Sequence, residues 1–288
     1  MRIGTRGSAL ALAQARQVDA LLGGSHELVH IATTGDRQPS PLRPAADKER
    51  WVRELDAALL AGDIDCAVHS AKDVPARLAD GIAIAAVPER ADPRDALCGS
   101  SSLAALAPSA RVGTSSLRRT AQLRALRPDL EVVALRGNVD TRLRRLAEGG
   151  FDAIVLALAG LERLGRGNEG VPLEELVPAA GQGCLAVTTR VGQESLVAAI
   201  DDAASARALA SERAVVRALE ADCHTPVGVH ASSLPDGRLR LRAFVGATDG
   251  SAWVRDELDD DDAQALGAAV AERLLRAGAR DVLDPQPR

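Results

Sequence analysis

The chain has 288 residues, of which 46% are hydrophobic and 26% are charged, and its formal net charge is -5. This composition is typical of a folded protein with two or three domains, and it excludes a disordered or fibrous chain. The weakly acidic balance argues against binding of nucleic acid or membranes through bulk charge. The sequence has no Tyr and very few other aromatic residues, which argues against base-stacking platforms for single-stranded nucleic acid.

The lack of a recognisable targeting signal and the spacing of the cysteines predict a cytoplasmic protein. No apolar run approaches the roughly 20 residues that cross a bilayer, and the start MRIGTRGSAL lacks the regions of a signal peptide. The four cysteines are far apart and form no CxxC motif, which indicates single thiols rather than a zinc ribbon or a disulfide framework: Cys66, Cys98, Cys184 and Cys223. We therefore expect no metal site.

The first 200 or so residues alternate short apolar runs with helical stretches. This alternation is typical of βα units in a mainly parallel α/β sheet. Strands are expected at 2–5, 28–33, 65–70, 82–87, 111–114, 131–136 and 152–159. Helical spacing of apolar residues predicts helices over 10–22 and 51–59. The charged, proline-containing segment 87–100 is expected to separate two lobes, because the strand pattern restarts soon after it.

The pattern changes from about residue 205. A helix with an apolar face over 209–219 is followed by turn signals at 235–237 and 249–250, which favour antiparallel hairpins. The alternation in 239–247 predicts a half-buried strand, and 266–274 predicts a last helix. The tail therefore reads as a small α+β domain with a three-stranded sheet covered on one side.

Three segments of the two lobes share one local design, in which a strand ends, a Gly, Ser or Thr turn follows and a helix begins beside an arginine. They are TRGS (5–8), GTSSLRR (113–119) and LRGNVDTR (135–142). Helix N-termini, hydroxyls and guanidinium forks together bind anions. The bland alternative is that the hydroxyls only cap helices and the arginines are solvated. The glycines match neither a Walker loop nor GxGxxG, so carboxylates are favoured over nucleotide phosphates.

The segment HSAKDVP (69–75) directly follows an expected strand, so Lys72 and Asp73 should emerge at the same sheet edge as the arginine turns. A carboxylate among cations stays ionised and is suited to stabilising positive charge and to moving protons. A surface ion pair is the alternative. Pro75 favours a fixed active-site loop.

Cys223 lies in LEADCHTPVG, in a loop between a helix and a strand of the tail. From there a thiolate could reach across an interdomain cleft. An inert thiol is the common alternative. A metal site with His224 and His230 lacks a fourth ligand, and a catalytic Cys–His pair is disfavoured because adjacent residues rarely face each other.

Several collinear motifs resemble the porphobilinogen deaminase (hydroxymethylbilane synthase) family: TRGS, AVHSAKDVP, ERADPRDAL, VGTSSLRR, LRGNVDTRL, DAIVLALAGLERLG, PAAGQGCLAV and the late cysteine before PVG. The resemblance runs through nearly the whole chain. It implies two periplasmic-binding-protein-like (type II) lobes and a small C-terminal α+β domain with a three-stranded antiparallel sheet. Lobe 1 would comprise 1–88 and 184–202, lobe 2 would comprise 89–183, and 205–288 would carry the cofactor cysteine.

The resemblance also implies a reaction and a site. Four porphobilinogen molecules would condense head to tail with loss of ammonia, giving hydroxymethylbilane for heme biosynthesis. Asp73 and Lys72 would be catalytic, with Asp73 stabilising positive charge on pyrrole nitrogens. A dipyrromethane cofactor, joined to Cys223 as a thioether, would contact Ser70, Lys72, Thr114, Ser115, Ser116, Arg118, Arg119, Arg136 and Gly137. The substrate would contact Arg6, Ser8, Lys48, Arg142, Arg163 and Gln182. The family resemblance implies a cytoplasmic monomer without nucleic-acid or membrane partners.

The chain departs from the family pattern in two places. The loop and helix start at 37–55 contain no glycine and three prolines, with Lys48 in place of the usual glycine-flanked lysine, which predicts a stiffer lid. Asp222 disfavours the thiolate form of Cys223, and His224 offsets this effect. Two alternatives follow: a non-catalytic module that binds an organic anion, and a paralogue that has lost cofactor attachment.

Overall fold

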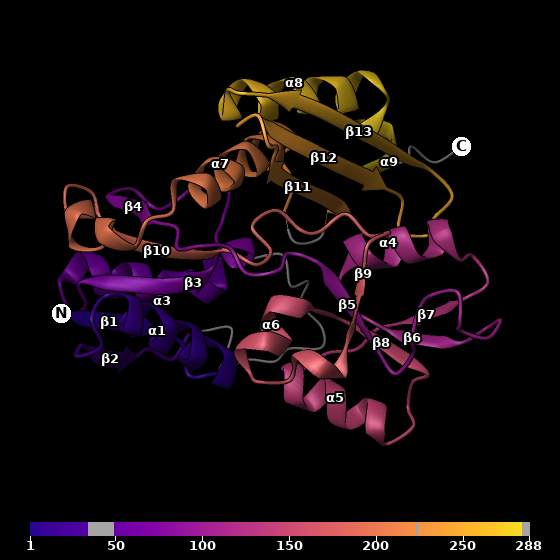
Figure 1. Ribbon diagram of the computed structural model, residues 1–288, viewed down its shortest axis with the longest axis horizontal. Coiled ribbons are helices and arrows are strands. Elements are labelled where there is room, and N and C mark those ends of the chain that lie inside the picture. The colour runs from indigo at the N-terminus through magenta and orange to yellow at the C-terminus, as the bar shows by residue number, and fades with distance from the viewer. Residues whose placement is uncertain (34–48, 223–224, 284–288) are drawn as a thin grey trace.

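The computed structural model describes residues 1–33, 49–222 and 225–283, which form three sheets with their helices. Figure 1 shows two α/β lobes side by side, with the C-terminal sheet and its helices lying across them.

Lobe 1 contains a five-stranded sheet in the order β2-β1-β3-β10-β4. Its strands are β1 (Arg2–Thr5), β2 (Glu27–His30), β3 (Cys66–Ser70), β4 (Ile82–Ala86) and β10 (Leu185–Arg190). Helices α1 (Ala9–Leu21) and α3 (Glu49–Ala61) cover opposite faces of this sheet, because Cys66 and Val68 pack with α1 residues while Ala67 packs with α3 residues. Alternating apolar residues on β3 thus bury both faces. Both predicted helices are confirmed, although Leu21 is 53% exposed.

Lobe 2 contains a second five-stranded sheet in the order β7-β6-β8-β5-β9. Its strands are β5 (Asp95–Cys98), β6 (Arg111–Gly113), β7 (Glu131–Val133), β8 (Ala153–Ala157) and β9 (Val171–Leu173). Its helices are α4 (Leu117–Leu126), α5 (Val139–Ala147) and α6 (Leu158–Arg163).

Short 3-10 turns occur in both lobes. They are η1 (Ala71–Asp73), η2 (Gly167–Glu169), η3 (Glu194–Leu196) and η4 (Ala198–Ile200).

The two lobes share one topology, which confirms the periplasmic-binding-protein-like type II arrangement. In each sheet three adjacent strands are parallel, β2-β1-β3 in lobe 1 and β7-β6-β8 in lobe 2, and the next position is taken by a strand that follows a crossing from the other lobe. These crossing strands, β10 and β5, run antiparallel to both of their neighbours. Within the described residues, four strands of each sheet run in one direction and the crossing strand opposes them, so the expected mainly parallel arrangement is confirmed apart from this one strand in each sheet. The second half of segment 87–100 is strand β5 and not a connection.

The C-terminal domain is the predicted antiparallel sheet of β11 (Val227–Ser233), β12 (Leu239–Gly246) and β13 (Trp253–Asp260). The turn signals at 235–237 and 249–250 join these strands. Helices α7 (Ala203–Ala218), α8 (Ala263–Arg276) and α9 (Ala279–Leu283) cover one face, as Figure 1 shows. On the other face, Phe244 is fully buried against Ala121 and Val177 of lobe 2.

A buried carboxylate joins the three parts. Glu212 of α7 accepts hydrogen bonds from Arg90 Nη1 at 2.6 Å, from the Gly181 amide at 2.6 Å and from the Ala231 amide at 2.8 Å. Arg90 and Gly181 belong to the two segments that cross between the lobes, whereas Ala231 belongs to β11. One side chain therefore ties the crossing segments to the C-terminal domain.

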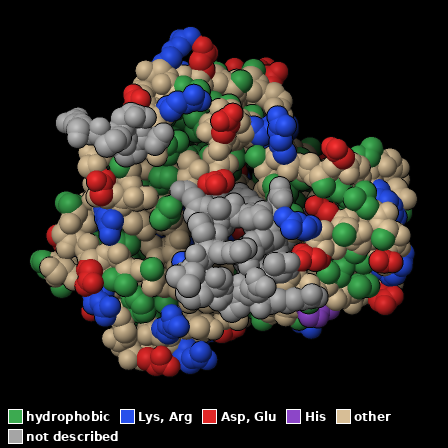
Figure 2. Space-filling view, turned by 180° about the vertical axis from the view of Figure 1, so that it is seen from behind, with side chains coloured by type: hydrophobic (Ala, Val, Ile, Leu, Met, Phe, Trp, Pro, Cys, Tyr) green, Lys and Arg blue, Asp and Glu red, His purple; other side chains and the backbone are tan. Residues whose placement is uncertain are grey.

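The surface shows no dominant charge on the face seen in Figure 2, where acidic and basic side chains are interspersed outside the grey atoms. Within the described ranges, no helix is both long and apolar enough to span a bilayer.

Candidate active site

The turn η1 carries Lys72 and Asp73 at the end of β3, and three contacts hold it. The Ala71 amide donates to the Cys184 carbonyl at 3.0 Å. Arg213 of α7 donates to the carbonyls of Pro75 and Ala76 at 2.8 and 3.1 Å. The turn is therefore fixed by the returning segment of the chain and by the C-terminal domain.

The Asp73 carboxylate is partly exposed and makes no hydrogen bond to any residue of the described ranges. Its oxygens are available to a ligand. Ser70, at the start of the turn, is half-buried and its hydroxyl makes no capping hydrogen bond. This end of β3 thus presents a carboxylate and a hydroxyl together.

Lys72 lies beside them and is desolvated. Its ammonium donates to Gln182 Oε1 at 3.2 Å. Burial, reinforced by the charge of Arg119, lowers the pKa of Lys72 to about 8, against the opposing effect of Asp73. The charge of Lys72 is therefore easily lost, and a bound anion would stabilise it.

His69, the first residue of the HSAKDVP motif, faces the interior. It is buried, and its Nε2 lies 3.0 Å from Thr188 Oγ1. Burial lowers the pKa of His69 to about 4, so this imidazole is neutral near pH 7. His69 therefore contributes packing at the base of the site and does not act as an acid.

The GTSSLRR turn joins β6 to α4 as expected. Ser116 caps α4 by accepting from the Arg119 amide at 3.4 Å, and Thr114 Oγ1 accepts from the Ser116 amide at 3.2 Å. Ser115 donates to the Leu135 carbonyl at 2.6 Å, which ties this turn to the neighbouring LRGN segment. The hydroxyls of Thr114, Ser115 and Ser116 thus serve the turn itself in the described chain.

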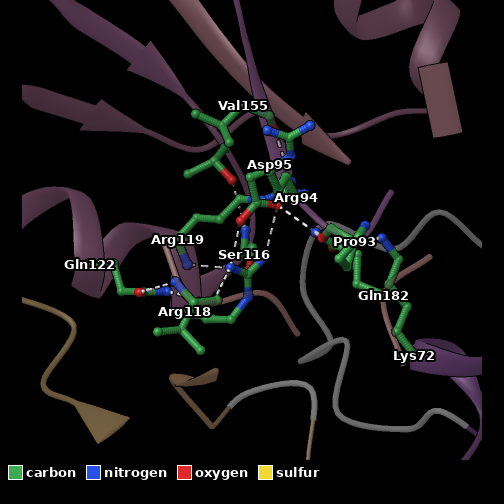
Figure 3. A network of polar contacts seen from close by, with 12 residues as sticks. Lys72, Pro93, Arg94, Asp95, Ser116, Arg118, Arg119, Gln122, Val155 and Gln182 are labelled. Carbon is green, nitrogen blue, oxygen red and sulfur yellow. Dashed lines mark hydrogen bonds and ion pairs between the residues drawn. The ribbon is translucent and has the colours of Figure 1, made fainter. Parts of the chain in front are cut away.

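Arg118 and Arg119 are each 5% exposed and converge on Asp95 of β5 (Figure 3). Arg118 Nη1 lies 2.6 Å from Asp95 Oδ2, and Arg119 Nη2 lies 2.7 Å from Asp95 Oδ1. The two guanidinium groups also donate to carbonyls of lobe 2. Burial alone would raise the pKa of Asp95, but the charges of these arginines hold it far below its usual range. Asp95 therefore stays ionised.

Asp95 is a residue of this site that the sequence reasoning did not identify. Asp95 lies within ERADPRDAL, a motif of the family resemblance that implies no role for its acids. A single acid inside the otherwise apolar run Asp95–Cys98 was the available signal, because a buried carboxylate requires a cationic partner.

The other predicted residues of the arginine turns lie in both lobes, and two of them, Arg6 and Arg142, interact electrostatically with residues of the site. Ser8 caps α1, and the charge of Arg6 acts on His69. Arg142 donates to the carbonyl of Gly137, whose φ of +117° suits glycine. Burial and the charge of Arg119 lower the pKa of Arg142 to about 10. Arg136 is exposed at the same turn.

Arg163 has a different position from the other predicted arginines. It donates to Gln17 of α1 at 3.2 Å and to the Gly183 carbonyl at 2.8 Å. Arg163 thus links α6 of lobe 2 to lobe 1 and to the returning segment. In the described chain two of its donors are engaged in holding the lobes together.

Three predicted residues, Lys48, Cys223 and His224, lie outside the described residues. The other three cysteines are buried, as expected of inert thiols. Burial raises the pKa of Cys66 and of Cys184 to about 12, and that of Cys98 to about 11. No cluster of three or more metal-ligating side chains occurs among the residues that the structure describes.

Comparison with known proteins gives matches over nearly the full length. Residues 1–198 match the family model described as porphobilinogen deaminase, dipyromethane cofactor binding domain, and residues 206–276 match the C-terminal domain model of that family. The porphobilinogen deaminase of Syntrophus aciditrophicus is 44% identical over 300 residues, covering 99% of this chain and 98% of the relative. That of Rubrobacter xylanophilus is 48% identical over 292 residues, covering 98% of this chain and 95% of the relative.

Solved structures show a weaker similarity. A TRAP periplasmic solute binding protein from Roseobacter denitrificans matches with 10% identity and a TM-score of 0.37, covering 69% of this chain and 77% of that chain.

Proposed function

The chain belongs to the porphobilinogen deaminase family, and we propose that it condenses four porphobilinogen molecules head to tail, with loss of four molecules of ammonia, and that hydrolysis by one water molecule then releases hydroxymethylbilane. The observation that carries this proposal is Asp73, a partly exposed carboxylate without a hydrogen bond in the described chain, beside the desolvated Lys72 and the arginines of both lobes. The family is that of an enzyme of porphyrin biosynthesis with a dipyrromethane cofactor.

The described residues fit a dipyrromethane, whose side chains are carboxylates. Burial, and after it the like charge of Arg119, lowers the pKa of both Lys72 and Arg142, so both cations are desolvated and lie within the field of another cation. Arg118 Nε is a buried donor without a hydrogen-bond partner among the described residues. An added set of carboxylates would relieve the repulsion between the cations and could satisfy further donors.

The protein side chains then divide the work. Lys72, Ser70, Arg119 and Arg142 bind and orient acid groups of cofactor and substrate. When bound, dipyrromethane supplies a pyrrole α-carbon to which the first substrate unit is joined. Asp73 stabilises positive charge on the substrate pyrrole as its C–N bond to the departing ammonia breaks. The same carboxylate moves the proton that is lost once the new C–C bond has formed.

Further parts of the proposal depend on the family alone. Cys223 is the proposed attachment point of the cofactor as a thioether. Lys48, Arg6, Ser8, Arg163 and Gln182 are proposed substrate contacts, and Thr114, Ser115, Ser116, Arg118, Arg136 and Gly137 are proposed cofactor contacts. The protein is proposed to act as a cytoplasmic monomer.

Asp73→Asn tests the proposal with a nearly isosteric change. We expect the variant to fold normally and to lose porphobilinogen consumption by about 100-fold or more, because a neutral amide neither stabilises a cation nor accepts a proton comparably. Porphobilinogen loss and ammonia release should occur in a one-to-one ratio in the unmodified protein.

Asp80→Asn, a change at an exposed acid in the following loop, is the matched control and should keep full activity. Full activity of Asp73→Asn would reject the central role of Asp73. Binding of porphobilinogen without any release of ammonia would instead favour the non-catalytic binding module.

A further inference from the structure

Asp95 is a buried carboxylate shared by two cations of the site. Its side chain is completely buried on β5. It accepts from Arg118 Nη1 and Nη2 at 2.6 and 3.1 Å, and from Arg119 Nε and Nη2 at 2.9 and 2.7 Å. These paired bonds fix the planes of both guanidinium groups.

Gln182 extends this network toward lobe 1. Its amide nitrogen donates to Asp95 Oδ1 at 2.9 Å and to the Pro93 carbonyl at 2.7 Å, while its oxygen accepts from Lys72 Nζ at 3.2 Å. Because both donor bonds fix the amide orientation, its oxygen has to face Lys72. Figure 3 shows Gln182 lying between Asp95 and Lys72. A continuous path thus connects α4 of lobe 2 with η1 of lobe 1.

The charges along this path act on Lys72 from several elements. Arg118 and Arg119 of α4 oppose its positive charge, whereas Asp95 of β5 and Asp73 of its own turn favour it. Loss of the Asp95 charge would leave the two arginines without their buried counter-ion. Their repulsion would then act on Lys72 with one opposing charge fewer.

We propose that Asp95 is a positioning residue of the active site. It fixes Arg118 and Arg119 by direct ion pairs. Through Gln182 it also orients the Lys72 ammonium and keeps this group charged. One buried carboxylate thereby sets the geometry of cations that belong to different lobes. The effect on turnover rests on the proposed function, but the effect on Lys72 does not.

The sequence allows a direct measurement, because it contains two lysines, Lys48 and Lys72. Protein labelled with ε-13C-lysine should give two lysine signals by NMR, and Lys48→Arg identifies that of Lys72. The full chain with Cys223→Ser is used as the parent, so that every sample lacks a thioether-bound group. We expect Asp95→Asn to lower the titration midpoint of Lys72 by about one pH unit.

Two further variants serve as a second test and as a control. Gln182→Met removes the link to Lys72 while leaving both arginine pairs, and it should lower the Lys72 midpoint by a smaller amount. Asp92→Asn is the control, since Asp92 lies on the same segment but pairs with Arg94. It should leave the midpoint unchanged. Circular dichroism and thermal melting establish that each variant is folded.

The proposal is overturned if folded Asp95→Asn keeps the parental Lys72 midpoint. Where Asp95→Asn does not fold, an unchanged midpoint in Gln182→Met overturns it equally. In proteins with Cys223 intact, Asp95→Asn should lower kcat/KM for porphobilinogen about 10-fold or more and move its alkaline limb to lower pH. Inactivity of the protein without any substitution would count against the proposed function. The NMR result would still decide the role of Asp95.

Discussion

At the scale of single residues, the site combines groups that are ready for a ligand with groups that the protein itself already holds. The side chains of Asp73 and Ser70 make no hydrogen bond within the described chain. Arg118 and Arg119, in contrast, are turned onto Asp95. The two arginines therefore contribute charge and position even before any acid group arrives.

Lys72 gives a pH prediction. Its pKa of about 8 in the described chain lies below the ordinary 10.5, so the positive charge is present below that pH and is lost above it. Carboxylates of a bound cofactor favour the charged form and move the midpoint upward. We expect kcat/KM for porphobilinogen to fall at or above about pH 8, as Lys72 loses its charge.

Lys72→Arg checks this assignment, since arginine keeps its charge over the accessible range. The variant should lose the alkaline limb even if its activity is lower. Retention of the same limb in Lys72→Arg would assign it to another group.

Sequence reasoning identified candidate cations and acids at this scale but not their partners. The pattern in GTSSLRR correctly predicted a strand end, a turn and the start of a helix. It could not reveal that both arginines meet Asp95, because this pairing depends on β5 lying beside β8 in the folded sheet. Such non-local contacts leave little local signal.

At the scale of elements, the returning segment PAAGQGC shapes the site through two glycines. Gly181 has φ +74° and Gly183 has φ +88°, a region that favours glycine. A Cβ on Gly181 would lie 2.9 Å from the backbone of Ala71, and one on Gly183 would lie 2.3 Å from the Ala91 carbonyl oxygen. The segment is thus packed tightly against both η1 and the other crossing segment.

Gly183→Ala should therefore destabilise the protein more than its backbone angle alone requires. Gly192 is a matched control, because it has φ +86° but no atom within 4 Å of an added Cβ. We expect Gly192→Ala to lower the free energy of unfolding by about 1–2 kcal/mol. Gly183→Ala should cost about 2 kcal/mol more, owing to the clash. Equal losses in urea denaturation would show that the close approach is unimportant.

The elements also show where pattern reading succeeds. Alternation and turn residues predicted the C-terminal hairpins, whose strands pair in sequence order. The crossing strands β5 and β10 pair with strands far away in the sequence, so their antiparallel direction was not predicted. β5 additionally carries the charged Asp95, which obscures its apolar character.

At the scale of the whole molecule, Glu212 joins the crossing segments to the C-terminal domain. Burial alone would raise the pKa of Glu212, but Arg90 and the nearby His230 lower it to about 2, from an ordinary value of 4.5. A carboxylate with a depressed pKa stabilises the folded state above its unfolded pKa, and this contribution is lost as pH falls through the folded value.

Glu212→Gln should consequently cost about 3–5 kcal/mol of unfolding free energy near pH 7, because it leaves Arg90 buried without its counter-ion. The difference in unfolding free energy between Glu212→Gln and the protein without substitutions should shrink as the pH falls from 4.5 toward about 2. Chemical denaturation at several pH values measures this difference. A difference that stays constant across that range would contradict the assigned role of Glu212.

The proposed activity depends on a covalent dipyrromethane in a chain whose cysteine flanks depart from the usual family pattern. Intact mass spectrometry of the full chain, expressed in a host that makes porphobilinogen, tests this most directly, with Cys223→Ser as the control. We predict a mass greater than that of the chain by two pyrrole units, and an unmodified mass for Cys223→Ser. A mass equal to that of the chain alone, in the protein with Cys223 intact, would contradict cofactor attachment and with it the proposed activity.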